Sequence, residues 1–368
     1  MQQERQHYVG LDLLRGIAAY GVVLAHVHVP LSLGFGFNVE PIITGFLGRA
    51  GVEVFFALSG FLIGGILCDL RDHTAANYGI FLLRRWMRTL PIYYVAVWFF
   101  LAYPGLFEPT APHKLWQYLT FTQNFLGQRD LTWFGVSWTL AVEEWFYLLL
   151  TVTVAFNVLV LRWRNGFICA VAFLIVLGMS LRFAAPLWGG SLGVAGRLDA
   201  IAYGCGLAWM VRRPELGRRM HDNRALICAC AAIGIYAVWL SERYGLMYTN
   251  RLTWVAHYCL WGITATGVVY AFYLWRPTSR TLVRVAAFAA AVSYPLYIWH
   301  QAVIWIFWHS RAGQGVGLLH VALVILLSSA IAYAMHVLVE KPFMWMRPRL
   351  GNKDEDQPSG HAVVARSF

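Results

Sequence analysis

Charged side chains are scarce in this sequence. Asp, Glu, Lys and Arg make up 13% of its 368 residues, about half of the roughly 25% that is usual in a soluble domain. Hydrophobic residues make up 59% of the chain, and the mean hydropathy is +0.56. So few charges cannot cover the water-facing surface of a chain this long, which excludes soluble, disordered and collagenous classes. The composition therefore predicts a protein embedded in a membrane.

Lysine and cysteine are also sparse. Lys114, Lys341 and Lys353 are the only lysines, so arginine carries nearly all of the positive charge. The six cysteines show neither a metal-ligand nor a redox spacing, and they predict no metal site and no disulfide framework. A net charge of +11 would suggest nucleic acid as the partner of a soluble chain. In a membrane chain, the distribution of the charges must be considered first.

Apolar segments long enough to cross a bilayer, which takes about 20 residues, recur along the chain. They lie near 11–30, 46–68, 88–105, 137–160, 166–184, 195–211, 225–241, 253–275, 286–308 and 316–339. The first segment has no signal-peptide cleavage site, so we expect it to be a retained helix. The predicted fold is an all-α, polytopic transmembrane helical bundle of about ten spans.

The basic residues alternate between the two sides of this predicted bundle. Twenty fall on the side of the two termini, eight on the other side, and Arg15 lies within the first span. The positive-inside rule then places both termini in the cytoplasm. The longest outer loop, 104–136, is rich in aromatic residues that could stack on a sugar ring. We expect one transmembrane domain over 1–349 and a disordered cytoplasmic tail over 350–368.

Arg15 and His26 are unusual because ionisable residues are costly inside a membrane span. Eleven residues apart on a helix, they share a face and lie about 16 Å apart along the axis. They are either functional, or a snorkelling arginine and a histidine that bonds to a neighbouring helix. The sequence assigns no clear role to His300, in a later span.

Glu143 and Glu144 are adjacent in the fourth predicted span. Their 100° separation on a helix means that they point in different directions, so one can pair structurally while the other faces a cavity. The alternative is a helix N-terminus capped by Ser137 or Thr139, with the acidic residues complementing the helix dipole.

Arginines cluster before the third predicted span. Arg85 and Arg88 are three residues apart, follow Arg84 and could together bind a phosphate, although anchoring at the inner leaflet would also explain them. Arg197 and Asp199 are expected to be a structural ion pair.

Seven sequence blocks between Leu11 and Pro342 resemble, in order, those of the acyltransferase-3 family of integral membrane O-acyltransferases. The blocks are LDLLRGIAAYGVVLAH, GVEVFFALSGFLIG, RRWMRTLP, SWTLAVEEWFYLL, RLDAIAYG, SYPLYIWH and VEKPF. The chain departs from the family pattern at Glu53, where aspartate is usual, and at Trp145, where glutamine is common. The chain ends about 25 residues after its last block, so we expect no SGNH-type esterase-like domain of the kind that some members carry.

The resemblance implies an enzyme in the bacterial inner membrane. It would transfer an acyl group, usually acetyl, from acyl-CoA on the cytoplasmic side to a hydroxyl of a cell-surface or exported saccharide. The implied partners are acyl-CoA, a saccharide or lipid-linked saccharide and membrane lipid, with no nucleic acid and no permanently bound cofactor. The implied catalytic residues are His26, Arg15 and Glu143, and the implied acyl-CoA contacts are Arg84, Arg85 and Arg88.

These roles form a mechanistic hypothesis. His26 would deprotonate the acceptor hydroxyl, Glu143 would orient His26 or the acceptor, and Arg15 would stabilise developing charge. A covalent acyl-His26 intermediate is an alternative. Two other functions also remain open, namely acylation of a small molecule or lipid and, as a non-enzyme, a multi-span transporter or flippase.

Overall fold

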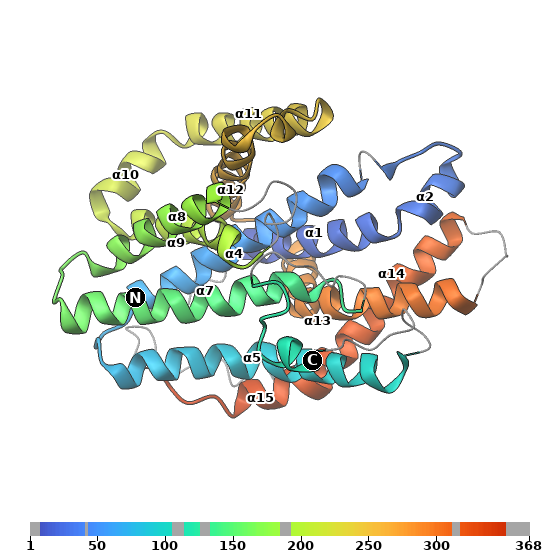
Figure 1. The fold of residues 1–368 in the computed structure, drawn as a ribbon, viewed down its shortest axis with the longest axis horizontal. Helices are drawn as coiled ribbons and strands as arrows, with labels where there is room; N and C mark the ends of the chain where they lie inside the picture. Colours follow the sequence, from blue (N-terminus) through green and yellow to red (C-terminus); the bar gives the residue numbers. More distant parts are fainter. Residues whose placement is uncertain are drawn as a thin grey trace.

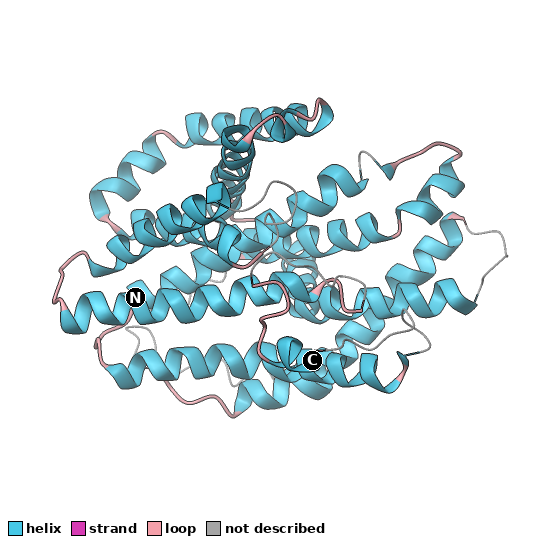
Figure 2. Cartoon of the chain, in the orientation of Figure 1, coloured by secondary structure: helices cyan, strands magenta, loops and turns pink. Residues whose placement is uncertain are grey.

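A computed structural model describes residues 8–40, 43–104, 114–125, 133–184, 193–310 and 317–350. Within these ranges the chain is mostly helical and forms no strand (Figure 2). Ten helices correspond one by one to the ten predicted spans: α1 (Val9–His26), α4 (Arg49–Cys68), α5 (Ala75–Ala102), α7 (Ser137–Ala155), α8 (Gly166–Ala184), α9 (Leu198–Arg212), α11 (Arg224–Arg243), α12 (Arg251–Leu274), α13 (Arg280–Ser310) and α14 (Leu318–Met335). The first residue of the predicted tail, Leu350, is buried in an apolar cluster, so the tail does not begin there. Residues 351–368 lie outside the described residues.

Shorter helical pieces join these ten. They are α2 (His28–Phe35), η1 (Ile43–Gly48), α6 (Leu115–Leu119), η3 (Phe156–Val160), η4 (Ala195–Arg197), α10 (Pro214–Asp222), η5 (Leu246–Tyr248), η6 (His336–Glu340) and α15 (Lys341–Trp345). Three of them, η1, η3 and η6, are π-helical, and each adjoins the end of a long helix.

Eight helices in the described part of the chain are long and apolar enough to cross a membrane, which makes this an integral membrane protein. The two predicted spans outside this set correspond to α5 and α9. Helix α9 has only 15 residues, and α5 carries three arginines in its first half. The total of ten spans and the cytoplasmic position of the termini therefore stay predictions.

Two predicted boundaries are wrong. The first predicted span, 11–30, is two helices, because α1 ends at His26 and α2 begins at His28. The third predicted span starts too late, since α5 begins at Ala75, where the Thr74 side chain accepts a hydrogen bond from the Asn77 amide. The arginine cluster therefore lies within a helix and not before one.

Helices α1 and α4 occupy the middle of the bundle (Figure 1). Helix α4 packs most extensively on α9, and α1 packs on α13, which also packs on α14. Helix α11 lies at one edge, where it packs on α12, while α5 and α15 lie at the opposite edge (Figure 1). In the span that contains α4, 61% of the residues are buried, whereas in α11 only 17% are. Helix α4 is therefore central and α11 is peripheral.

Glycines explain why α4 and α9 pack so closely. A Cβ atom on Gly60 of α4 would lie 1.9 Å from the Ile201 carbonyl oxygen, and one on Gly204 of α9 would lie 2.0 Å from the Ala57 carbonyl oxygen. Small residues let membrane helices approach at backbone distance, where van der Waals packing supplies the attraction. Both glycines belong to the sequence blocks described above.

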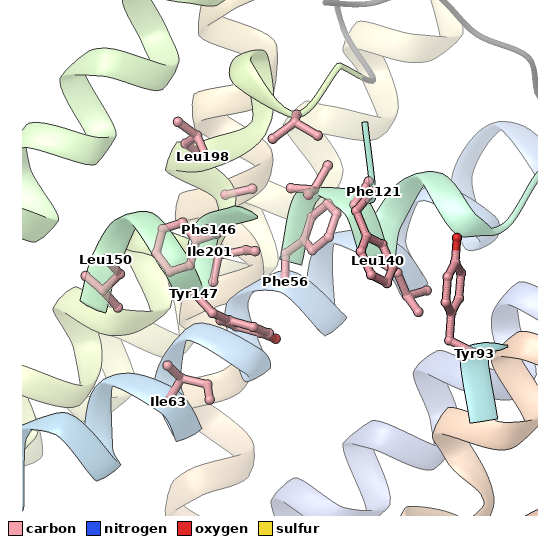
Figure 3. Packing of buried hydrophobic residues seen from close by; sticks show 14 of the residues in the cluster. Phe56, Ile63, Tyr93, Phe121, Leu140, Phe146, Tyr147, Leu150, Leu198 and Ile201 are labelled. Carbon is pink, nitrogen blue, oxygen red and sulfur yellow. The ribbon is translucent and has the colours of Figure 1, made fainter. Parts of the chain in front are cut away.

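The largest apolar cluster joins α4, α5, α7 and α9. Phe56, Leu140, Phe146 and Ile201 are among its buried residues (Figure 3). Aromatic residues of the predicted outer loop 104–136 enter the same cluster, including Trp133 and others that are almost fully buried: Tyr118, Phe121 and Phe134. The expectation that such residues stack on a sugar is wrong for these four, because they are core residues. Residues 105–113 and 126–132 of that loop lie outside the described residues.

Candidate active site

A central cavity with an empty volume of about 750 Å³ lies among α1, α4, α5, α7 and α13. Most of its wall is apolar or aromatic, and a few charged side chains project into it. The residues with polar or charged side chains that line it are Arg15, Ser59, Arg85, Arg88, Thr89, Thr139, Glu143, Ser293, Tyr294 and Tyr297. An apolar cavity with a few converging polar groups is typical of a small-molecule site.

Glu143 is the centre of a hydrogen-bonded group at this cavity. Its Oε2 atom accepts hydrogen bonds from the Tyr147 hydroxyl at 2.5 Å and from Arg85 Nη2 at 3.1 Å. Arg85 Nη2 also donates to the Tyr147 oxygen at 2.7 Å, and Ser59 Oγ contacts that oxygen too. The sequence predicted both Glu143 and Arg85, but in separate roles. The structure joins them as an ion pair.

The other two arginines of the cluster have protein partners as well. Arg88 Nε lies 3.3 Å from Oε1 of the buried Glu340, whose other oxygen lies 2.7 Å from His336 Nδ1. Arg84 Nη1 donates to the Pro348 carbonyl oxygen at 2.5 Å. We call the end of the bundle that carries Arg84, Arg85 and Arg88 the arginine end.

Arg15 lines the same cavity, and the guanidinium has no carboxylate within ion-pair distance among the residues that the structure describes. It is the charged cavity residue that is left to meet an anionic ligand. His26 lies eleven residues further along α1, at the last position of the helix, and is not among the residues that line the cavity. The two residues are thus at different depths, as their spacing predicts.

His26 lies beside His300 of α13. The ring centroids are 4.9 Å apart, and His300 Nε2 is 3.2 Å from His26 Nδ1. His26 is exposed, whereas His300 is completely buried. One turn before His300, Tyr297 lines the cavity, with its ring centroid 5.9 Å from that of His300. The histidine pair therefore adjoins the cavity at its Tyr297 side.

Glu144 points away from the central cavity, as the 100° separation predicts. Its Oε1 atom accepts a hydrogen bond from Thr89 at 2.8 Å, and the residue borders a separate groove lined by Trp86, Tyr94 and Trp145. The capping alternative is wrong, because α7 begins at Ser137 and its first turn contains no acidic residue.

The expected ion pair between Arg197 and Asp199 is wrong. Arg197 pairs with Glu53 of α4, and Asp199 pairs with Arg182 of α8. All four side chains are buried. Residues two apart on a helix face different directions, which is why each finds its partner on a different neighbouring helix.

No group of three or more His, Cys, Asp or Glu side chains within the described ranges could hold a metal ion. The cavity and the adjoining histidine pair present arginine, carboxylate, hydroxyl and imidazole groups. These are the groups that acid–base and charge-stabilising chemistry requires.

The model of the acyltransferase domain family matches residues 8–337, which is most of the chain. The chain belongs to the acyltransferase-3 family. The family that the sequence blocks predicted is thereby confirmed, although the last block, VEKPF, lies beyond the matched residues.

Relatives of this acyltransferase-3 chain have informative names. O-acetyltransferase OatA of Staphylococcus aureus is 24% identical over 361 residues, which cover 90% of this chain and 56% of the relative. Peptidoglycan O-acetyltransferase OatA of Listeria monocytogenes is 25% identical over 346 residues, with 82% and 50% covered. Putative peptidoglycan O-acetyltransferase YrhL of Bacillus subtilis is 22% identical over 379 residues, with 92% and 55% covered. The chain thus spans about half the length of these curated relatives. No solved structure matches it.

Sequence reasoning about this acyltransferase-3 chain missed Tyr147, Glu340 and the place of His300. Tyr147 and Glu340 lie within quoted blocks, and each contacts a predicted residue. Their spacing to Glu143 and His336, four residues in each case, was the available signal, because side chains at i and i+4 meet on a helix.

Proposed function

We propose that this protein transfers an acyl group, most simply acetyl, from acyl-CoA to a hydroxyl of a cell-surface or exported saccharide. The observation that carries the proposal is the central cavity, which has arginines at one end and the exposed His26 beyond its other end. Acyl-CoA is long, with its phosphates at one end and its thioester at the other. Such a donor could reach from Arg15 to His26, which are separated by about 16 Å along α1.

The arginine end suits the phosphates because guanidinium groups bind phosphate through forked hydrogen bonds. Arg15 and Arg88 are the residues we assign to this contact, together with Arg84. Arg88 is 30% exposed and can exchange its protein partner for a ligand, and Arg15 has no competing carboxylate among the described residues. Arg85 is held by Glu143 and Tyr147, so we assign it to shaping the cavity wall.

His26 is the group we assign to the chemical step. Its imidazole would take the proton of the acceptor hydroxyl while the hydroxyl oxygen attacks the thioester carbonyl carbon. The new C–O bond forms, the C–S bond breaks, and the leaving thiolate takes the proton back from His26. The predicted orienting contact from Glu143 to His26 is not among the hydrogen bonds of Glu143, which go to Arg85 and Tyr147. Glu143 is therefore assigned to the cavity wall.

We choose the acceptor to test from the names of the relatives, because the cavity does not identify it. The Listeria and Bacillus relatives are both named for O-acetylation of peptidoglycan. The glycan of peptidoglycan is therefore the first saccharide to test. An exported polysaccharide and a lipid-linked sugar are the next. The place of action we propose is the bacterial inner membrane, where such acceptors are exported.

The test uses the full chain in lipid nanodiscs with acetyl-CoA. Release of CoA should require a saccharide acceptor, and mass spectrometry should find one added acetyl group on that saccharide. The His26→Ala variant is the control for background hydrolysis. Acceptor movement across proteoliposomes without any release of CoA would instead identify a transporter and overturn the proposal.

A further inference from the structure

Hydrogen bonds to helix carbonyl oxygens determine which nitrogen of His26 and of His300 carries a proton. His26 Nδ1 lies 2.9 Å from the Val22 carbonyl oxygen, and His300 Nδ1 lies 3.1 Å from the Leu296 carbonyl oxygen. A carbonyl oxygen can only accept a hydrogen bond. Both Nδ1 atoms must therefore be donors, so both rings carry a proton on Nδ1.

This assignment explains the distance of 3.2 Å between His300 Nε2 and His26 Nδ1. A neutral His300 with its proton on Nδ1 has a lone pair on Nε2. That lone pair accepts a share of the His26 Nδ1 proton, which is also directed at the Val22 carbonyl. The remaining nitrogen, Nε2 of His26, keeps its own lone pair.

The surroundings suit His300 to this task. It is completely buried, and no carboxylate lies within ion-pair distance of either ring among the described residues. Helices α1 and α13 approach closely, since a Cβ atom on Gly16 would lie 2.4 Å from that of Ala289. This close packing of α1 on α13 lets the His26 and His300 rings reach each other.

We propose that His300 is a positioning residue for acyl transfer, which holds His26 in the tautomer and orientation that present Nε2 as the base. The inference rests on the function proposed above. When His26 Nε2 takes the acceptor proton, the ring becomes an imidazolium, and its Nδ1 proton stays bonded to His300 Nε2. The proton then leaves from Nε2 to the thiolate, so His300 begins and ends the cycle neutral.

Two conservative variants separate this role from a structural one. In His300→Gln, the side-chain oxygen can occupy the place of Nε2 and accept from His26. In His300→Asn, the shorter side chain reaches only as far as Nδ1, and the bond to His26 is lost. His257 is the matched control because it is also a buried histidine, bonded to Ser241 at 3.0 Å among residues that do not line the cavity.

We expect His300→Asn to lower kcat about 10- to 100-fold, by analogy with the loss of the hydrogen-bond partner of a metal-bound histidine. The KM for acetyl-CoA should stay the same, and His300→Gln should restore most of kcat. His257→Gln should leave kcat unchanged. Nitrogen-15 NMR of labelled histidine should show His26 protonated on Nδ1 in the wild type and in His300→Gln. In His300→Asn the Val22 carbonyl is the one remaining acceptor of the two, so the share of the Nε2-protonated tautomer should rise.

Equal kcat in the Asn and Gln variants, or a His26 tautomer that does not respond to them, would overturn the inference. The NMR measurement needs no substrate, so it tests the contact even if acyl transfer is absent. A wild-type protein that has the Nδ1 tautomer but releases no CoA would contradict the proposed function and leave the positioning contact intact.

Discussion

The Tyr147 hydroxyl donates a 2.5 Å hydrogen bond to Oε2 of Glu143, one helical turn earlier on α7. The same hydroxyl oxygen accepts from Arg85 at 2.7 Å, and the Arg85 guanidinium lies over the Tyr147 ring at 4.6 Å. Tyr147 is completely buried. One tyrosine therefore fixes both charged partners at the wall of the central cavity.

Replacing Tyr147 by Phe should loosen this wall. The Glu143 carboxylate and Arg85 each lose a hydrogen bond to the phenol, and hydrogen bonds to charged groups contribute about 1.5–3 kcal/mol. We expect the free energy of unfolding to fall by about that amount and the KM for acetyl-CoA to rise. The matched control is Tyr93→Phe, which removes a 2.9 Å bond to the neutral Tyr118 carbonyl oxygen. An unchanged KM in Tyr147→Phe would contradict the cavity assignment of Glu143.

Removing the His26 imidazole should abolish acyl transfer. General acid–base catalysis contributes about 10²- to 10⁴-fold, so we expect His26→Ala to lower kcat by at least the smaller factor. His28, two residues later and bonded to the Ala25 carbonyl, is the control. Gel filtration in detergent checks that both variants stay folded. Full activity in His26→Ala would exclude His26 as base and as covalent nucleophile.

The helices and the residues around the cavity could be predicted to different degrees. The ten helices were visible because apolar runs and sparse charge follow from the bilayer itself. The ion-pair partner of each buried charged residue could not be predicted from the sequence. Arg197 pairs with Glu53, 144 residues away, because the close approach of α4 and α9 brings them together. Local spacing carries no information about such a contact.

The end of the first span was missed for a related reason. Residues 11–30 are mostly apolar and predict one continuous span. The available sign of the break between α1 and α2 was Pro30 in the first turn of α2, because proline has no N–H to bond the carbonyl of His26. His26 occupies the last position of α1, where it meets His300. The sequence could therefore place His26 on a face, but not beside its partner from α13.

The buried pair of Arg197 and Glu53 should matter far more for stability than an exposed one. Breaking a buried ion pair by removing one partner costs about 3–5 kcal/mol, since it leaves an uncompensated charge. We expect Arg197→Met to lower the free energy of unfolding by about that amount, and a second change, Glu53→Leu, to restore much of it. The pair of Arg212 and Asp69 is about one third exposed. Asp69→Asn should cost about 1 kcal/mol or less. Equal losses for the two pairs, measured by chemical denaturation, would contradict this prediction.

The close contact of α4 and α9 predicts opposite effects of the same substitution at two glycines. Gly204→Ala should destabilise the protein, because the new Cβ would lie 2.0 Å from a backbone oxygen that cannot move freely. A Cβ atom added to Gly79 of α5, which is exposed, would meet nothing within 4 Å among the described residues. Gly79→Ala should be neutral or stabilise by up to about 1 kcal/mol, through the higher helix propensity of alanine. Thermal unfolding in one detergent compares the two, and a stable Gly204→Ala variant would argue against backbone contact.

Arg347, just after α15, adds a further positive charge at the arginine end. Burial and the charges of Arg88 and Arg84 lower its pKa to about 10. Two of its nitrogen atoms, Nε and Nη2, are buried without a hydrogen-bond partner in the described part of the chain. Because its pKa is lower in the folded state, folding disfavours the charged form at neutral pH. This loss of folding free energy decreases only as the pH rises through about 10, where Arg347 loses its proton in the folded protein.

Removing this charge should therefore stabilise the empty protein and weaken its response to the donor. We expect Arg347→Gln to raise Tm at neutral pH without ligand, and to reduce the further rise in Tm that CoA produces in the wild type. Arg349 is exposed and two residues away, so Arg349→Gln is the control and should change neither value. If CoA stabilises Arg347→Gln as much as the wild type, Arg347 does not contact the donor, because a lost charge-assisted bond to phosphate must reduce binding.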